Sequence, residues 1–116
     1  TRDILVAVIV PKTVEKVVYL SQRNQSTDFP VLTCAVAKRA DGYAAVVGAT
    51  PHLAEVVLDR QGVLTELTDE SISKFAEQVL EEIRFGSNVR SGAAYRKVIC
   101  RVLVKRALEA WKGEQI

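Results

Sequence analysis

Runs of apolar residues alternate with short polar breaks through the first half of the chain, which is the pattern of β-strands. Such runs occupy residues 4–10, 16–20, 31–38 and 43–49. The first run has seven consecutive apolar residues and stops at Pro11, which cannot donate a hydrogen bond to a neighbouring strand. Its length predicts a buried strand and falls far short of the roughly 20 residues that a membrane span requires.

The third and fourth runs are separated by a turn that ends in Asp41-Gly42, a strong signal for a tight β-hairpin. In this hairpin, alternation places Leu32, Cys34 and Val36 on one face and Thr33 and Ala35 on the other. The string Gly48-Ala49-Thr50-Pro51 then ends the strand. Residues 21–28 are all polar and predict a loop, whereas residues 52–60 fit either a short helix or a strand.

The last third of the chain has helical periodicity. Residues 72–83 carry one apolar stripe at positions 72, 75, 76, 79, 80 and 83, with Asp69 and Glu70 at the start and Gly86 just beyond the end. A second helix is expected over about residues 92–112, with the Ser91 hydroxyl accepting a free N–H of the first turn. Its apolar face includes Tyr95, Ile99, Val102, Leu103 and Ala107, and is widened by Val98, Val104, Leu108 and Trp111.

Strands followed by helices predict an α+β fold. We expect a small antiparallel sheet of three to four strands with about three helices packed on one face, in a single domain spanning residues 1–116. A start at Thr1, immediately before a strand-like run, suggests a domain cut from a longer polypeptide.

Composition adds little about chemistry. The chain has 48% hydrophobic and 26% charged residues and a formal charge of +2, which is ordinary for a globular domain and too small to indicate nucleic-acid binding. The single histidine, His52, cannot build a metal site alone and is expected in a surface turn. Cys34 and Cys100 form no C-x-x-C pair. We expect two reduced, packed thiols, with a disulfide between them left open.

Lys97, Arg101 and Lys105 form a basic row at i, i+4 spacing on the second helix, with Arg96, Arg106 and Lys112 nearby. Such a row is usually the solvated side of an amphipathic helix. Binding of RNA or DNA through it is a minor alternative, which predicts an affinity that collapses as salt is raised.

The string Val89-Arg90-Ser91-Gly92-Ala93-Ala94-Tyr95-Arg96, followed by Val-Leu-Val-Lys-Arg-Ala-Leu, resembles the C-terminal domain of one family. This family is the FAD-binding subunit of the molybdenum hydroxylases, which includes xanthine dehydrogenase and the aerobic carbon monoxide dehydrogenase. Residues 47–51, Val-Gly-Ala-Thr-Pro, are similar to the turn after the family's hairpin. Residues 4–11 look like the strand that leaves its flavin-holding middle domain.

The resemblance implies a non-catalytic accessory domain of a cytoplasmic oxidoreductase. In that family electrons pass from a molybdopterin centre through two [2Fe–2S] clusters to FAD and then to an acceptor. The partners implied are the upstream FAD-binding domains and the iron–sulfur and molybdopterin subunits, and neither nucleic acid nor membrane. FAD is held mainly by the upstream domains, so the isolated domain should bind no cofactor tightly and no metal.

The same resemblance indicates residues 21–28 as the edge nearest FAD, with Leu20, Arg23 and Asp28 as the candidate cofactor-binding residues. Leu20 replaces the lysine that the family has on the flavin side, and Asn88 replaces a usual aspartate. The alternative function is a free-standing interaction module that docks through the apolar final helix around Val98, Val104, Leu108 and Trp111.

Overall fold

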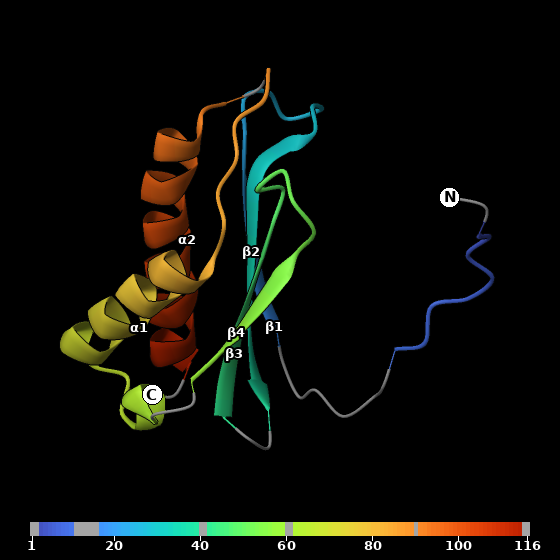
Figure 1. Ribbon diagram of the computed structural model, residues 1–116. Helices are drawn as coiled ribbons and strands as arrows, with labels where there is room; N and C mark the ends of the chain where they lie inside the picture. Colours follow the sequence, from blue (N-terminus) through green and yellow to red (C-terminus); the bar gives the residue numbers. More distant parts are fainter. Residues whose placement is uncertain (1–2, 11–16, 40–41, 60–61, 90, 115–116) are drawn as a thin grey trace.

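A computed structural model describes residues 3–10, 17–39, 42–59, 62–89 and 91–114 of the protein. Four antiparallel strands, β1 (Val17–Arg23), β2 (Pro30–Arg39), β3 (Gly42–Gly48) and β4 (Glu55–Leu58), form one sheet in the order β1-β2-β3-β4. A 3-10 turn η1 (Val63–Thr65) leads to α1 (Asp69–Glu82) and α2 (Ala93–Glu114). Both helices lie on the same face of the sheet (Figure 1). The α+β expectation is confirmed, with two α-helices and one 3-10 turn where about three helices were expected.

The β2–β3 hairpin has the expected register. Arg39 is paired with Gly42, whose φ of 114° is open to glycine and strained for other residues. Asp41 of the turn signal lies outside the described residues. Leu32, Cys34 and Val36 are fully buried on the inner face, beneath the helices. Residues 52–60 were compatible with a short helix or a strand; in the structure residues 55–58 form the edge strand β4.

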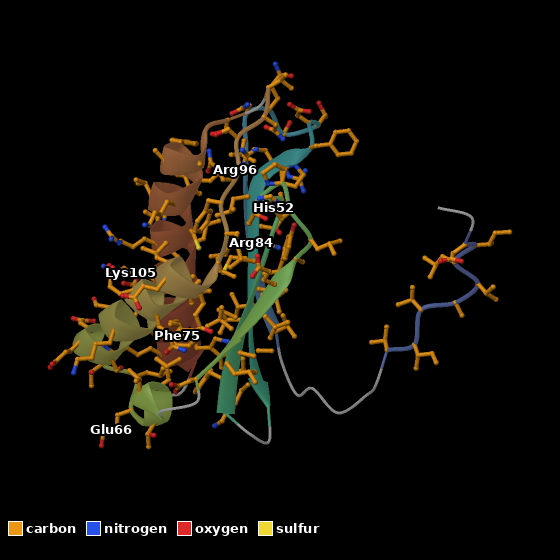
Figure 2. The ribbon with its side chains drawn as sticks, viewed as in Figure 1. His52, Glu66, Phe75, Arg84, Arg96 and Lys105 are labelled. Carbon is orange, nitrogen blue, oxygen red and sulfur yellow. The ribbon has the colours of Figure 1, made fainter. Side chains whose placement is uncertain are left out.

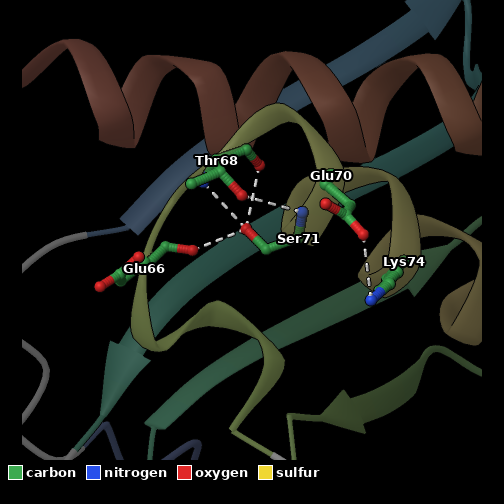
Figure 3. A network of polar contacts seen from close by, with 5 residues as sticks. All are labelled: Glu66, Thr68, Glu70, Ser71 and Lys74. Carbon is green, nitrogen blue, oxygen red and sulfur yellow. Dashed lines mark hydrogen bonds and ion pairs between the residues drawn. The ribbon is translucent and has the colours of Figure 1, made fainter.

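Helix α1 begins with a reciprocal cap. The Thr68 hydroxyl accepts from Ser71 N at 3.2 Å, and the Ser71 hydroxyl accepts from Thr68 N at 2.9 Å (Figure 3). The apolar stripe from Ile72 to Leu80 is buried as predicted. The helix ends differently: Ile83 has an extended backbone and its N–H donates to Val79 O, so the chain leaves the helix three residues before Gly86.

Helix α2 buries a stripe that includes the residues expected to make it unusually wide. Val104 and Leu108 are fully buried, and Trp111 donates from Nε1 to Val36 O at 3.2 Å while its ring meets Tyr43 edge-on. Two other residues of the predicted apolar face are not packed, since Tyr95 is 45% and Val98 59% exposed. The apolar width of α2 is therefore mostly core, which removes the main argument for docking through this helix.

The prediction of a buried strand at residues 4–10 was wrong. This N-terminal apolar segment is assigned to no strand, and its six largest side chains are between 73% and 91% exposed. Figure 1 shows it well away from the sheet, on the side opposite the helices. Apolar content favours a strand, but a strand also needs a neighbour to pair with, and the described part of the chain supplies none here. None of the described helices is long and apolar enough to cross a membrane.

Candidate functional site

Three connections meet at one end of the sheet, which we call the loop end: residues 24–29, 49–54 and 83–92 (Figure 1). The register explains the meeting, because Arg23 pairs with Pro30, and Thr33 with Gly48, at this end of the strands. The loop end thus collects residues 24–28 of the predicted loop, whose first three residues instead end β1, and two of the segments that carry the family resemblance.

Arg96 is the organising residue of the loop end (Figure 2). Its side chain is 1% exposed although arginine is seldom fully buried. The guanidinium donates from Nε to Val31 O at 2.9 Å and from Nη1 to Gly86 O at 2.9 Å and Ser91 O at 2.7 Å. Its Nη2 donates to Asn88 Oδ1 at 2.8 Å. One side chain on α2 therefore fixes both the start of β2 and the connection between the helices.

Gly86 joins the other two segments. Its N–H donates to Thr50 O, while its own carbonyl accepts from Arg96. A Cβ at Gly86 would lie 2.6 Å from Pro51 Cδ and 3.3 Å from His52 Nε2, so only glycine fits this close approach. The turn it contacts has a cis Thr50–Pro51 peptide and a Thr50 hydroxyl that accepts from His52 N at 3.0 Å. The turn at residues 50–52 is thus held against Gly86 and, through it, Arg96, although these residues are distant in sequence.

Of the three candidate cofactor-binding residues, Arg23 and Asp28 lie together and Leu20 lies apart. Arg23 donates from Nη1 to Asp28 O at 2.7 Å, closing the polar loop, and the Asp28 carboxylate accepts from Phe29 N at 2.7 Å. Leu20 lies apart from them, paired with Cys34 on the inner face and packed against the core. Arg90 of the family-like string lies outside the described residues.

Two structural roles were not predicted from the sequence. The N–H of Ala93 donates to the hydroxyl of Ser87 at 2.8 Å, so the expected cap by Ser91 was wrong. The connection folds back between Asn88 and Ser91, which brings Ser87 to the helix start. The burial of Arg96 was also missed. Its spacing of four from Cys100 places it on the buried stripe, a signal that the periodicity did contain.

Exposed apolar side chains lie on the three connections of the loop end. Phe29 is 71%, Leu53 89% and Val89 100% exposed, one from each of the three connections. His52 is exposed in the turn, as predicted. Among the described residues, no three or more His, Cys, Asp or Glu are grouped so that they could hold a metal ion. The loop end therefore carries exposed apolar side chains on a backbone that hydrogen bonds hold in place.

Elsewhere the polar clusters serve the fold. The Asp59 carboxylate accepts from Val63 N at 2.9 Å and Leu64 N at 2.7 Å, which caps η1. A hollow beside the start of α1 is lined by the capping residues and by Glu70, which pairs with Lys74 at 3.3 Å (Figure 3). These groups stabilise turns and helix starts, so we assign them no ligand.

The two cysteines are free, buried thiols, as expected. Burial raises the pKa of Cys34 to about 12, with a further contribution from the neighbouring Cys100, whose own pKa burial also raises to about 12. Both thiols stay protonated near neutral pH and are poor nucleophiles.

Comparison with known proteins leaves the family open. A scan of the chain against protein-family models finds no match, and a search of curated proteins finds no significant relative.

Proposed function

We propose that this chain is an accessory, non-catalytic domain of the FAD-binding subunit of a cytoplasmic molybdopterin/iron–sulfur/FAD oxidoreductase. Its part is to pack beside the flavin region with its loop end, while electron transfer from the molybdenum centre to FAD takes place in other domains and subunits. The observation that carries the proposal is that two of the strings that resemble the family, residues 47–51 and 89–96, are joined through Gly86, whose N–H donates to Thr50 O and whose carbonyl accepts from Arg96.

The structure supports a docking role for the loop end in two ways. The backbone of each connection is fixed by hydrogen bonds, so that binding orders few additional groups. Phe29, Leu53 and Val89 project from this fixed backbone with most of their surface in water. Phe29 is the aromatic residue among them, and aromatic side chains are enriched at protein interfaces.

The edge nearest FAD is the polar loop, where Arg23 and Asp28 are held together. The Arg23 side chain is partly buried and bonded to the loop backbone, so its first effect is to shape the loop. Leu20 packs against the core, apart from this loop. Asn88 keeps an oxygen acceptor for Arg96 where the family has an aspartate, and so retains the loop-end geometry with one charge fewer.

Part of the positive charge on α2, in the basic row and near it, is buried or paired. Arg96 is buried, Arg101 pairs with Glu77 at 2.9 Å, and Lys112 pairs with Asp69 at 3.6 Å. Acidic residues of α1 thus offset part of the positive charge that nucleic-acid binding would use.

The proposal is tested on the polypeptide encoded by the uninterrupted reading frame that contains this chain. Purified, it should carry bound FAD with the visible absorption of a flavin, whereas the 116-residue chain alone should bind FAD no tighter than micromolar in a calorimetric titration. A full-length polypeptide without flavin would overturn the proposal, and so would sub-micromolar FAD binding by the chain alone.

A matched pair of variants tests the flavin-side edge. Arg23→Gln in the full-length polypeptide should alter the flavin absorption or its reduction by the electron donor. Arg106→Gln, an exposed arginine on α2, should leave both unchanged. Equal spectra and reduction rates for the two variants would remove residues 21–28 from the flavin site.

A further inference from the structure

The outer face of the sheet, which no described helix covers, has three uncharged rows of side chains, of which two are apolar. Antiparallel pairing arranges its side chains in three rows across the strands. The rows are Val17-Ala37-Ala44-Leu58, Tyr19-Ala35-Val46-Val56 and Ser21-Thr33-Gly48. None of the side chains in these rows is charged. An antiparallel sheet with one face in water normally alternates apolar and polar residues, so this pattern is typical of a sheet covered on both faces.

The shape of the outer face also suits a partner. The central strands contribute small residues, among them Ala35, Ala37 and Gly48, whereas the edge strands contribute larger ones. Tyr19 on β1 and Val56 on β4 are each 55% exposed, and Val17 is 50% exposed. Small residues between larger ones make a shallow trough about 14 Å wide, at a strand spacing of about 4.8 Å. This width accommodates a helix or a strand pair.

The N-terminal apolar segment identifies where the partner must be. Its side chains are exposed and require a protein body to bury them. Val10 and Val17 are seven residue steps apart, a distance of at most about 25 Å. Val17 itself belongs to the outer face. Whatever buries residues 4–10 is therefore tethered beside that face, on the side opposite the helices (Figure 1), where its effective concentration is high.

We infer that the outer face of the sheet is a domain–domain interface, and that its occupant is the part of the same polypeptide that buries residues 4–10. This inference rests on the proposed function for the identity of that part, the upstream FAD-binding domains. The domain then contacts its neighbour with two surfaces: the loop end, and the uncharged trough across β1 to β4.

Single cysteines on the two faces test the inference. Tyr19→Cys and Val56→Cys place a thiol on the outer face, and Lys74→Cys places one on α1, where the lysine side chain is 65% exposed. The native Cys34 and Cys100 are fully buried and contribute little background. Maleimide labelling rates are measured for each variant in the 116-residue chain and in the full-length polypeptide.

In the chain alone, all three thiols should react at similar rates. In the full-length polypeptide, the labelling rates at positions 19 and 56 should fall to about one tenth or lower, because the reagent reaches them only when the interface opens. The rate at position 74 should stay the same. Unchanged rates at 19 and 56 would overturn the inference. Protection in the chain alone that increases with its concentration would also overturn it, because the occupant is then a second copy of the chain.

The flavin content of the same samples separates the two proposals. If the full-length polypeptide binds flavin while positions 19 and 56 remain reactive, the proposed function stands and the interface is ruled out. Protection of both positions without flavin keeps the interface and removes the proposed function.

Discussion

Arg96 Nε lies 2.9 Å from the carbonyl oxygen of Val31, and this hydrogen bond joins residues that are 65 positions apart. The bond connects α2 to the second residue of β2, close to the end of the polar loop. The same guanidinium holds Gly86, Asn88 and Ser91. A single buried cation thus sets the geometry of the end of the domain that we propose faces the flavin region.

Arg96→Met should lower the free energy of unfolding by about 3 kcal/mol or more, because several buried carbonyl oxygens lose a charged donor. Arg96→Lys should recover only part of this loss, since one ammonium cannot reach acceptors arranged around a planar guanidinium. Urea unfolding followed by circular dichroism measures both. Arg106→Met is the control, because Arg106 is exposed on the same helix and its loss should change stability by less than about 0.5 kcal/mol. Equal effects at 96 and 106 would contradict the role given to Arg96.

Gly86→Ala should destabilise the domain by roughly 1–3 kcal/mol, because the new methyl group meets Pro51 at 2.6 Å and the Thr50 carbonyl at 3.2 Å. Gly92→Ala is the matched control. The nearest atom to a Cβ there is the Ser87 hydroxyl oxygen at 4.0 Å, so the substitution should be tolerated. Thermal unfolding of the two variants gives the comparison. A Gly86→Ala variant as stable as Gly92→Ala would show that the β3–β4 turn does not press on the helix connection.

Thr68→Ala should cost about 1 kcal/mol, since it leaves the Ser71 N–H without its cap. Thr68→Ser retains the hydroxyl and should restore most of that stability. Amide hydrogen exchange in the first turn of α1 reports the effect locally: faster exchange at Ser71 is expected in the alanine variant and not in the serine variant. Equal exchange in both would mean that the capping box contributes nothing measurable.

The free energy of unfolding should fall as pH rises above about 9. Burial and the neighbouring thiol raise the pKa of Cys34 to about 12 in the folded protein, and burial does the same for Cys100. The unfolded thiols lose their protons first, so this stabilisation is complete below their usual pKa and is lost as pH approaches the folded value. The double variant Cys34→Ala, Cys100→Ala should show a shallower fall between pH 9 and 11. Identical pH profiles for the variant and the unchanged chain would contradict the prediction.

The parts of the fold that the sequence predicts are those set by local patterns. Alternation along β2 places Leu32, Cys34 and Val36 in the core, and Gly42 marks the hairpin, because strand faces and turn dihedrals depend on a few adjacent residues. The buried stripe of α1 is likewise predicted by the spacing of its apolar residues, because that spacing depends only on the helical repeat. Residues 4–10 show the limit of such patterns: their composition favours a strand, but pairing depends on a neighbour that composition cannot specify.

The candidate site was predictable only in part. The polar run of residues 21–28 is visible in the sequence, whereas the hydrogen bond from Arg23 to the backbone carbonyl of Asp28 was not predicted. The roles of Arg96, Gly86 and Ser87 depend on contacts between segments that meet only after the sheet and helices pack. Such contacts leave no local pattern, apart from the position of Arg96 on the buried stripe of α2.

The strand order β1-β2-β3-β4 follows the order of the chain, and this has a consequence for synthesis. Each strand leaving the ribosome finds its partner already made, so the meander can assemble by neighbouring pairings with little loop-closure entropy. Helix α2 emerges last, and its arrival brings Arg96 to Val31. The hydrogen bond between Arg96 and Val31 can therefore form only after all three connections of the loop end have been synthesised.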